Sequence, residues 1–488
     1  MKSGSSHKFR GIKISFTIIA LISVALITLL WERTPLISSL IPPESQNVIA
    51  TETVTVTPVT HLKDEYEQPS AEDHFSTENI PKHLPVEEAN HVHVVHSLNS
   101  SRLPTSFLEP KKDKNLAKLP SEKTVHPGCN YGKGRWVADS KRPLYSGFEC
   151  KQWLSSMWAC RLMQRKDFSY EMFRWQPEGC EMPEFKASEL LKRMQHKTVA
   201  IVGDSLGRQQ FQSLMCMVTL GKENPEVEDV GSEYGLVQEP GATRPAGWAY
   251  RFPSTNTTIL YYWSASLCEL EPLNPSDPAT NYAMHLDRPV PFLKQYLHKF
   301  GVLVLNTGHH WNRGKFNANR WVMYANGNPV KDRKLAMMMN AKNLTIYSVV
   351  KWVDLQIMQY PQLKAFFRTI SPRHFANGDW NTGGSCDNTT PLTAGSEVLQ
   401  NVSSDPGAEG AVKGTRVKLL DITALSELRN EGHISKYGIK ANVGVQDCLH
   451  WCLPGIPDTW NEILYAQLFL LKANFVWRGN HIESNMQL

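Results

Sequence analysis

Beyond residue 180 the sequence alternates short apolar runs with longer segments of helical periodicity, and this alternation restricts the fold more than any other feature. The apolar runs have the length of buried strands and occupy 198–202, 301–305, 417–420 and, less clearly, 363–370. Segments with helical spacing or helix-start signals occupy 206–220, 334–359 and 457–469. Strands that alternate with helices in this way build a parallel sheet covered on both faces, so we expect an α/β fold.

Three polar segments directly follow predicted strands. Gly203-Asp-Ser205 comes after the first apolar run, residues 306–311 follow the run at 301–305, and residues 371–374 follow the run at 363–370. In an open parallel sheet, ligands bind beyond the carboxyl ends of the strands. We therefore expect these segments to line one common site.

Ser205 is the candidate nucleophile of this site. A serine hydroxyl becomes nucleophilic when a base takes its proton, and histidine suits that task because its ordinary pKa lies near neutrality. Gly203 permits a tight bend between strand and helix, and the amides at the start of the helix can stabilise an oxyanion. The tripeptide alone occurs often by chance, so its position after a buried strand carries the interpretation.

The base and its orienting group are candidates near the C-terminus, in Asp447-Cys-Leu-His450. An aspartate three residues before a histidine allows one loop to present a carboxylate and an imidazole at the same site. The same spacing also fits a solvated loop aspartate and a helix-capping histidine. Spacing by itself does not separate these two interpretations.

The N-terminus carries an apolar run at 14–31 that is about long enough to cross a bilayer. Four basic residues precede it: Lys2, Lys8, Arg10 and Lys13. Positive charge stays on the cytoplasmic side, which predicts a type II protein with its C-terminal part in the lumen. A cleavable signal peptide is the alternative, but its apolar region would be shorter and no small-x-small cleavage site follows Leu30.

All nine cysteines lie between Cys129 and Cys452, in the part that we expect to be globular. Oxidised pairs in a secretory compartment explain this distribution. Zinc is the alternative, but the close pair Cys448 and Cys452 lacks a second pair at zinc-finger spacing, so we expect no metal. The odd count leaves one thiol free, and Cys268 is the candidate because it stands alone in its segment.

The composition suggests a division into five parts. These are a cytoplasmic tail (1–13), a membrane anchor (14–31), a flexible lumenal stem rich in Thr, Pro, Glu, His and Lys (32–124), a Cys- and Trp-rich subdomain braced by disulfides (125–185) and the α/β domain (186–488). Three histidines at 91–96 suggest metal binding or an incidental cluster in the stem. In the lumen, Asn-x-Ser/Thr sites would accept glycans, and they stand at Asn99, Asn256, Asn343, Asn388 and Asn401.

The charge distribution indicates no nucleic-acid partner. The formal net charge of +5 arises from 52 basic and 47 acidic residues scattered along the chain. This balance is too mild and too dispersed for a surface that binds phosphate backbones.

Several segments together resemble the plant trichome birefringence-like proteins. They are Gly203-Asp-Ser-Leu-Gly-Arg-Gln-Gln210, Ser371-Pro-Arg-His-Phe375 with Gly378-Asp-Trp-Asn-Thr-Gly-Gly384, and the run from Asp447-Cys-Leu-His450 to Trp460-Asn461. The resemblance extends from about Cys129 to the C-terminus and includes Trp175-Gln-Pro-Glu-Gly-Cys180. Members are Golgi polysaccharide O-acetyltransferases similar to the GDSL/SGNH esterases. The resemblance therefore implies a flavodoxin-type parallel sheet with the serine after its first strand.

The resemblance also implies roles and partners. Ser205 would be the nucleophile, His450 the base and Asp447 its orienting group, in a two-step transfer through an acetyl-serine. No cofactor would be bound, but an acetyl donor would be required, either acetyl-CoA or an acetylated intermediate. The acceptor would be a cell-wall polysaccharide (xylan, mannan, pectin or xyloglucan), modified at the Golgi membrane. Three disulfides are implied: Cys129–Cys180, Cys150–Cys216 and Cys386–Cys448.

Further residues are candidates for contacts with the substrate or the oxyanion: Gly203, Asp204, Arg208, Asn306, Gly308, Trp311, Trp380 and Trp451. Arg208 would bind substrate or developing charge, or form a plain salt bridge. The family more often has Asn where this chain has Gln209, which leaves a donor role there open. The tryptophans would stack on sugar rings and keep water out, or else pack in the core.

Two other functions use the same sequence features. A polysaccharide acetylesterase would share all three catalytic residues and use water as the acceptor. A polysaccharide-binding wall protein with a vestigial site is the alternative from a different class, and the intact Ser205, Asp447 and His450 argue against it.

Overall fold

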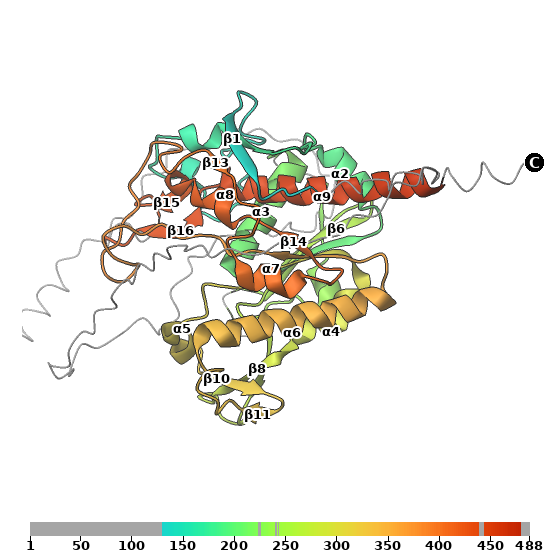
Figure 1. Ribbon diagram of the computed structural model, residues 1–488, viewed down its shortest axis with the longest axis vertical. Coiled ribbons are helices and arrows are strands. Elements are labelled where there is room, and N and C mark those ends of the chain that lie inside the picture. The colour runs from blue at the N-terminus through green and yellow to red at the C-terminus, as the bar shows by residue number, and fades with distance from the viewer. Residues whose placement is uncertain (1–128, 223–225, 240–241, 243, 439–443, 480–488) are drawn as a thin grey trace, which may run out of the picture. The chain divides into compact units, whose positions relative to one another are not determined.

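The computed structural model describes residues 129–222, 226–239, 242, 244–438 and 444–479 (Figure 1). The predicted tail, membrane anchor and stem, together with Asn99 and the histidines at 91–96, lie outside the described residues. Within the described part of the chain, no helix combines the length and the hydropathy needed to cross a bilayer.

A seven-stranded sheet forms the centre of the fold, in the order β14-β12-β9-β3-β6-β5-β4. Its strands are β3 (Thr198–Gly203), β4 (Glu228–Asp229), β5 (Gly247–Phe252), β6 (Thr257–Trp263), β9 (Phe300–Leu305), β12 (Lys364–Arg368) and β14 (Lys418–Leu420). The strands from β14 to β6 pair in parallel, whereas β5 and β4 add an antiparallel edge. The α/β fold with a parallel-rich sheet is thus confirmed, and each predicted strand is present.

The parallel strands follow the flavodoxin order. Numbered along the chain from β3, they lie in the sheet as 2-1-3-4-5, the order of one family of doubly wound folds. Strands β6 and β9, the next two parallel strands along the chain, lie on opposite sides of β3. The carboxyl end of β3 is therefore a topological switch point, where such folds bind ligands. Gly203 ends β3 there, and Ser205 begins the next helix.

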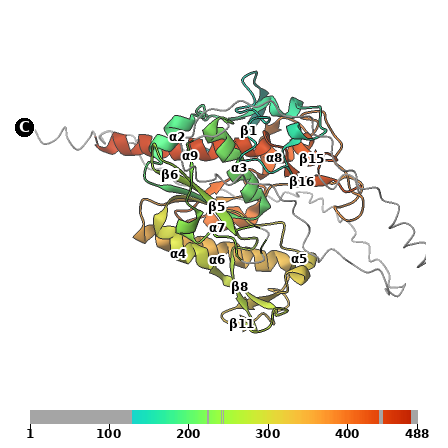
Figure 2. The same ribbon diagram turned by 180° about the vertical axis from the view of Figure 1, so that it is seen from behind.

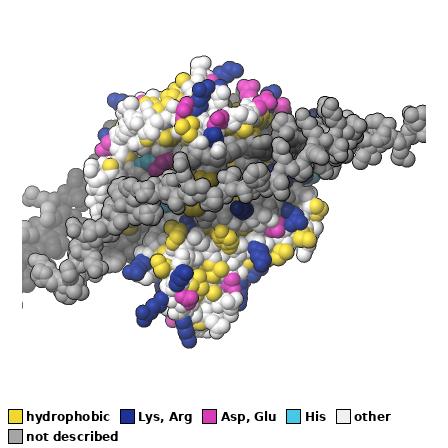
Figure 3. Space-filling view, in the orientation of Figure 1, with side chains coloured by type: hydrophobic (Ala, Val, Ile, Leu, Met, Phe, Trp, Pro, Cys, Tyr) yellow, Lys and Arg dark blue, Asp and Glu magenta, His cyan; other side chains and the backbone are white. Residues whose placement is uncertain are grey.

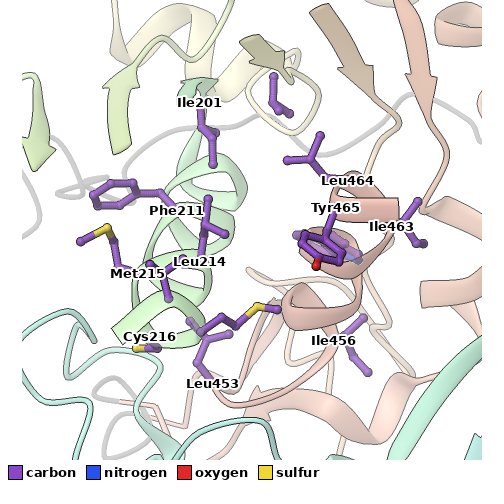
Figure 4. Close-up of a cluster of buried hydrophobic side chains, with 14 of the residues drawn as sticks. Ile201, Phe211, Leu214, Met215, Cys216, Leu453, Ile456, Ile463, Leu464 and Tyr465 are labelled. Carbon is purple, nitrogen blue, oxygen red and sulfur yellow. The ribbon is translucent and has the colours of Figure 1, made fainter. Parts of the chain in front are cut away.

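Helices cover both faces of this sheet (Figures 1 and 2). One face packs against α3 (Ser205–Thr219) and α9 (Ile456–Gly479), and the other against α4 (Pro291–Tyr296), α6 (Met338–Gln359) and α7 (Pro406–Val412). Successive residues of β3 serve opposite faces: Ile201 packs toward α3, and Ala200 and Val202 pack toward α6. Figure 4 shows part of the first of these cores, with Phe211 and Leu214 on α3 and Ile463 and Leu464 on α9.

A second sheet packs beside α6 and has the order β11-β10-β8-β7. It comprises β7 (Cys268–Pro272), β8 (Tyr282–Pro289), β10 (Trp321–Ala325) and β11 (Asn328–Pro329), with the short helix α5 (Arg313–Ala318) before β10. The sequence pattern does not predict these strands, because their exposed and buried residues do not alternate regularly. Cys268 begins β7 and is the free, buried cysteine that the sequence indicated.

The Cys- and Trp-rich segment is joined to the α/β part by its own sheet and by disulfides. Its strands β1 (Gly134–Ala138) and β2 (Phe173–Pro177) pair with each other, and β1 also pairs with β13 (Glu397–Val398). The structure contains the three disulfides that the resemblance implied, Cys129–Cys180, Cys150–Cys216 and Cys386–Cys448, and a fourth, Cys160–Cys452. Two of the four, Cys150–Cys216 and Cys160–Cys452, link this segment to α3 and to the residues that precede α9. Elements of both parts therefore share one hydrophobic core.

The remaining α-helices and strands of the described residues are short. They are α2 (Ala187–Arg193), α8 (Thr423–Glu427), β15 (His433–Ser435) and β16 (Asp447–Trp451), of which the last two pair antiparallel. On the face in Figure 3, basic and acidic side chains are interspersed.

Buried hydrogen bonds fix α9 against α3. The Asp458 carboxyl group accepts from Tyr145 Oη at 3.0 Å, from Ser213 Oγ at 2.6 Å and from the Gly455 amide at 2.9 Å. Asn461 Nδ2 donates to the Gln210 carbonyl at 3.0 Å and to Ser213 Oγ at 2.9 Å. Because unpaired groups here would be costly, this network sets the position of one helix relative to the other.

Asp458 makes the stability of the fold depend on pH. Burial raises its pKa to about 7, although the hydrogen bonds from Ser213, Gly455 and Tyr145 act to lower it. The folded protein therefore keeps a proton that the unfolded chain releases near pH 4. The free energy of unfolding should fall as pH rises from about 4 to about 7, by up to about 4 kcal/mol from this group.

Asp458→Asn should remove that part of the pH dependence, measured by urea unfolding at several pH values with the disulfides intact. The exposed Asp277→Asn is the matched control and should keep the wild-type slope. Equal slopes in wild type and Asp458→Asn would show that Asp458 is ionised throughout.

Candidate active site

Three polar side chains meet at the end of β3, although they come from opposite ends of the domain sequence. Ser205 Oγ lies 2.7 Å from His450 Nε2, across 245 residues of chain, and His450 Nδ1 lies 2.9 Å from Asp447 Oδ2. A carboxylate can only accept, so Nδ1–H donates to Asp447 and Nε2 is left to accept the Ser205 hydroxyl proton. The arrangement is that of a serine nucleophile, its base and an orienting carboxylate.

The turn that presents Ser205 is shaped by Asp204 and Asn306. Asp204 is the N-cap of α3: its Oδ1 accepts from the Leu206 amide at 3.0 Å and from Asn306 Nδ2 at 2.6 Å. A Cβ at Gly203 would lie 2.0 Å from Asn306 Oδ1, so only glycine lets Asn306 approach this closely. Asp204 and Asn306 therefore hold the strand-to-helix turn, and an oxyanion role for Asn306 stays a prediction.

Asp447 is kept ionised by its surroundings. Burial acts to raise its pKa, but the adjacent His450 ring and the amides of Leu449 and His450, which donate to Oδ1 at 3.1 and 2.9 Å, lower the pKa far below its usual range. The carboxylate therefore stays ionised, and able to orient His450, until the pH falls far below the usual aspartate range.

Hydrogen bonds from Gln209 and His433 fix the backbone at His450 and Trp451. Gln209 Nε2 donates to the Trp451 carbonyl at 2.6 Å, and its Oε1 accepts from the Trp451 amide at 3.1 Å. His433 Nδ1 donates to the His450 carbonyl at 3.0 Å, and burial lowers the pKa of His433 to about 3, so this ring is neutral. The Trp451 ring stacks on His433 with centroids 3.9 Å apart.

The Cys- and Trp-rich segment supplies one wall of the site. The Trp158 ring lies 5.7 Å from the His450 ring, and its Nε1 donates to Gln212 Oε1 on α3. The Trp158 carbonyl accepts from the Leu453 amide at 3.0 Å, and the Cys160–Cys452 disulfide lies close by in sequence. Sequence reasoning did not single out Trp158, because only the tertiary fold brings it to His450.

Two histidines from the segment after β9 also approach the site. His309 Nε2 donates to the Ser371 carbonyl at 2.7 Å, and burial lowers the pKa of His309 to about 4. His310 packs edge-on against Trp263, with centroids 5.5 Å apart. The segments after β3, β9 and β12 thus lie together at one end of the sheet, as expected for parallel strands.

The candidate tryptophans differ in exposure. Trp451 is fully buried and donates to Ser371 Oγ at 2.9 Å, and Trp311 is buried against Phe316. Their rings cannot stack on a sugar, and the interpretation as core residues is the correct one for both. Trp380 is 60 % exposed, in a loop after β12, so a role in stacking stays open for it alone of the three.

The other candidates have local roles that the structure shows. A Cβ at Gly308 would lie 2.7 Å from Ile370 Cδ1, so Gly308 provides close packing. The Arg208 guanidinium lies over the rings of Trp158 and Trp248, at 5.2 and 4.9 Å. Within the described residues, no group of three or more His, Cys, Asp or Glu side chains could hold a metal ion.

The predicted glycan acceptors within the described residues are not equivalent. Asn256 and Asn401 are exposed. Asn388 Nδ2 is bonded to Thr393 Oγ1 and Asn430 Oδ1. Asn343 lies inside α6 with a buried Oδ1 against Gly407, so the folded protein does not present it as an acceptor.

Sequence comparisons identify the family of the chain. Residues 182–467 match the family described as "PC-Esterase: GDSL/SGNH-like Acyl-Esterase family found in Pmr5 and Cas1p", and residues 127–181 match the PMR5 N-terminal domain. The chain therefore has the domain of an acyl-esterase-type family, and within that domain Ser205, His450 and Asp447 are in contact.

The closer relatives define the family more narrowly. Protein trichome birefringence-like 14 of Arabidopsis thaliana is 64% identical over 352 residues, which cover 70% of this chain and 86% of the relative. Protein trichome birefringence-like 15 of the same plant is 58% identical over 375 residues, 75% of each chain. The chain belongs to the trichome birefringence-like proteins.

Gln209→Leu tests the two hydrogen bonds between Gln209 and the backbone of Trp451. The substitution leaves the Trp451 amide and carbonyl without their partner in a buried site, which should lower the free energy of unfolding by about 2–4 kcal/mol. Urea unfolding measures the loss, and the exposed Gln195→Leu is the control, with a change of under about 0.5 kcal/mol. A Gln209→Leu protein as stable as the control would mean that the two bonds contribute nothing.

Proposed function

We propose that this protein is an acyltransferase that moves an acetyl group from a donor, through an acetyl-Ser205 intermediate, to a hydroxyl of a cell-wall polysaccharide. The observation that carries the proposal is the contact of Ser205 Oγ with His450 Nε2 at 2.7 Å, with Asp447 on the far nitrogen. Membership of a family with an acyl-esterase-type domain supports the reaction class.

In the first step, Ser205 Oγ attacks the acetyl carbonyl while its proton passes to His450 Nε2. The tetrahedral intermediate collapses as the bond to the donor breaks, and the donor leaves with the proton from His450. Ser205 then carries the acetyl ester. The oxyanion forms beside the N-terminus of α3, where the helix dipole favours negative charge.

In the second step, a sugar hydroxyl gives its proton to His450 Nε2 and attacks the acetyl-serine. The Ser205–acetyl bond breaks, and Ser205 regains its proton from the imidazolium. Transfer requires that the sugar outcompetes water at this point, and the Trp158 wall beside His450 supports such exclusion. An acetylesterase would run the same two steps with water as the second nucleophile.

We place this reaction in the Golgi lumen, on a single-pass type II protein. Four disulfides support a compartment of the secretory pathway, because such bonds are rare in the cytosol. Xylan, mannan, pectin and xyloglucan are the candidate acceptors.

The decisive experiment offers an acetyl donor and each deacetylated polysaccharide to the purified protein. Wild type should transfer acetyl groups to polymer, and a rapid quench should trap Ser205 with the added mass of one acetyl group. Ser205→Ala should do neither. Acetate release without polymer modification would identify an esterase, and a fully active Ser205→Ala would end both enzyme assignments.

Asp447→Asn should slow formation of the acetyl-enzyme by about 10³–10⁴-fold, because an amide no longer fixes the His450 tautomer or balances its charge. Stopped-flow acylation by an activated acetyl ester measures the rate.

The pKa of Asp447 is lowered in the folded protein, so its ionised form persists as pH falls below the usual aspartate range. Protonation of Asp447 should therefore cause no loss of activity between pH 7 and pH 5. If the wild-type rate fell in that range and the fall disappeared in Asp447→Asn, this expectation would be contradicted.

A further inference from the structure

A surface depression adjoins the active site through Arg208. It is open to solvent, and its lining comes from the Cys- and Trp-rich segment, from α3 and from β5. Arg208 follows Ser205 by three residues on α3, so the two side chains leave the same side of the helix, about 4.5 Å apart along its axis. The Trp158 ring lies next to both Arg208 and His450, so one indole separates the base from the guanidinium.

The lining of the depression is cationic. Lys151 and Arg208 both contribute, and none of the described residues that line it is acidic. Lys151 is exposed and Arg208 is buried to 8% exposure between two indoles. An ammonium and a guanidinium in one lining favour a ligand with a carboxylate or a phosphate, and a guanidinium binds either group through parallel N–H donors.

Aromatic surface and a hydrogen-bond donor complete the lining. The Trp248 ring is half-buried and Tyr250 lies beside it on β5. Trp153, only 5% exposed, packs edge-on against Tyr250 at 4.7 Å, and its Nε1–H has no hydrogen-bond partner among the described residues. An apolar ring face with donors and cations at its edge suits a sugar ring that bears an anion.

We infer that this depression binds a uronic acid residue of the acceptor polysaccharide, with its carboxylate at Lys151 and Arg208 and its ring against Trp248. The inference rests on the proposed function, because it assigns the acceptor a second contact beside the reacting hydroxyl at Ser205. The phosphate of an acetyl donor shares the anionic chemistry. The ring of a uronic acid also uses the Trp248 face, which a phosphate group alone does not, so the lining favours the sugar.

Calorimetry on the full chain carrying Ser205→Ala tests binding without chemistry. The probes are a galacturonic acid oligomer, a neutral xylose oligomer of equal length, and coenzyme A. The acidic oligomer should bind at least about tenfold more tightly than the neutral one at low salt, and the difference should shrink as salt rises.

Two substitutions in the same background locate the site. Lys151→Gln and Arg208→Lys should each weaken binding of the acidic oligomer by about three- to tenfold. Lys151→Gln should leave binding of the neutral oligomer unchanged, since the exposed Lys151 side chain is assigned only the carboxylate contact. Lys351→Gln, an exposed change on α6 at the opposite face of the sheet, is the matched control and should change neither. Because Lys151 is exposed, its variant remains informative if Arg208→Lys folds poorly.

Equal binding of the two oligomers, or no effect of Lys151→Gln, would overturn the inference. If Lys151→Gln weakened binding of coenzyme A and left binding of the acidic oligomer unchanged, the depression would be a donor site, and the inference would also be overturned. Failure of the transferase proposal is seen separately, as absence of acetyl-Ser205 in the wild-type protein.

Discussion

The hydrogen bond between Ser205 and His450 depends on holding two distant segments of chain within 2.7 Å of each other. Ser205 is fixed by the end of a central strand, but His450 lies on a short strand at the periphery, which has little regular structure of its own. Contacts with neighbouring segments hold the His450 strand in place. Gln209 bonds the backbone of Trp451, His433 bonds the carbonyl of His450, and Cys452 is covalently tied to Cys160.

Helix α3 connects these supports. Its first residue is the proposed nucleophile, its buried side holds Trp451 through Gln209, and its Gln212 positions Trp158 at the site wall. Farther along, Ser213 contacts Asp458 at the start of α9, the helix that follows the His450 segment. A shift of α3 would therefore displace the nucleophile and the base together, which preserves their mutual geometry better than supports on separate elements would.

Much of the architecture follows from local sequence. The runs at 198–202 and 301–305 are apolar throughout because both faces of the central sheet are covered, and the polar residues after them reach one edge. The second sheet was not predictable in this way, because β8 and β10 are covered unevenly. Trp451 and Trp380 belong to equally polar-looking segments, yet one is buried and the other exposed. Only the tertiary contacts of Trp451 with Ser371, His433 and Gln209 distinguish them.

The disulfide between Cys160 and Cys452 spans 292 residues and joins the two parts of the chain that the family descriptions treat separately. Trp158 and Lys151 belong to the first part, and Ser205 and His450 to the second. Replacing residues 127–181 of this chain would thus replace a wall of the candidate active site together with one half of its covalent tether. The first part is therefore a structural component of the site and not a separate appendage.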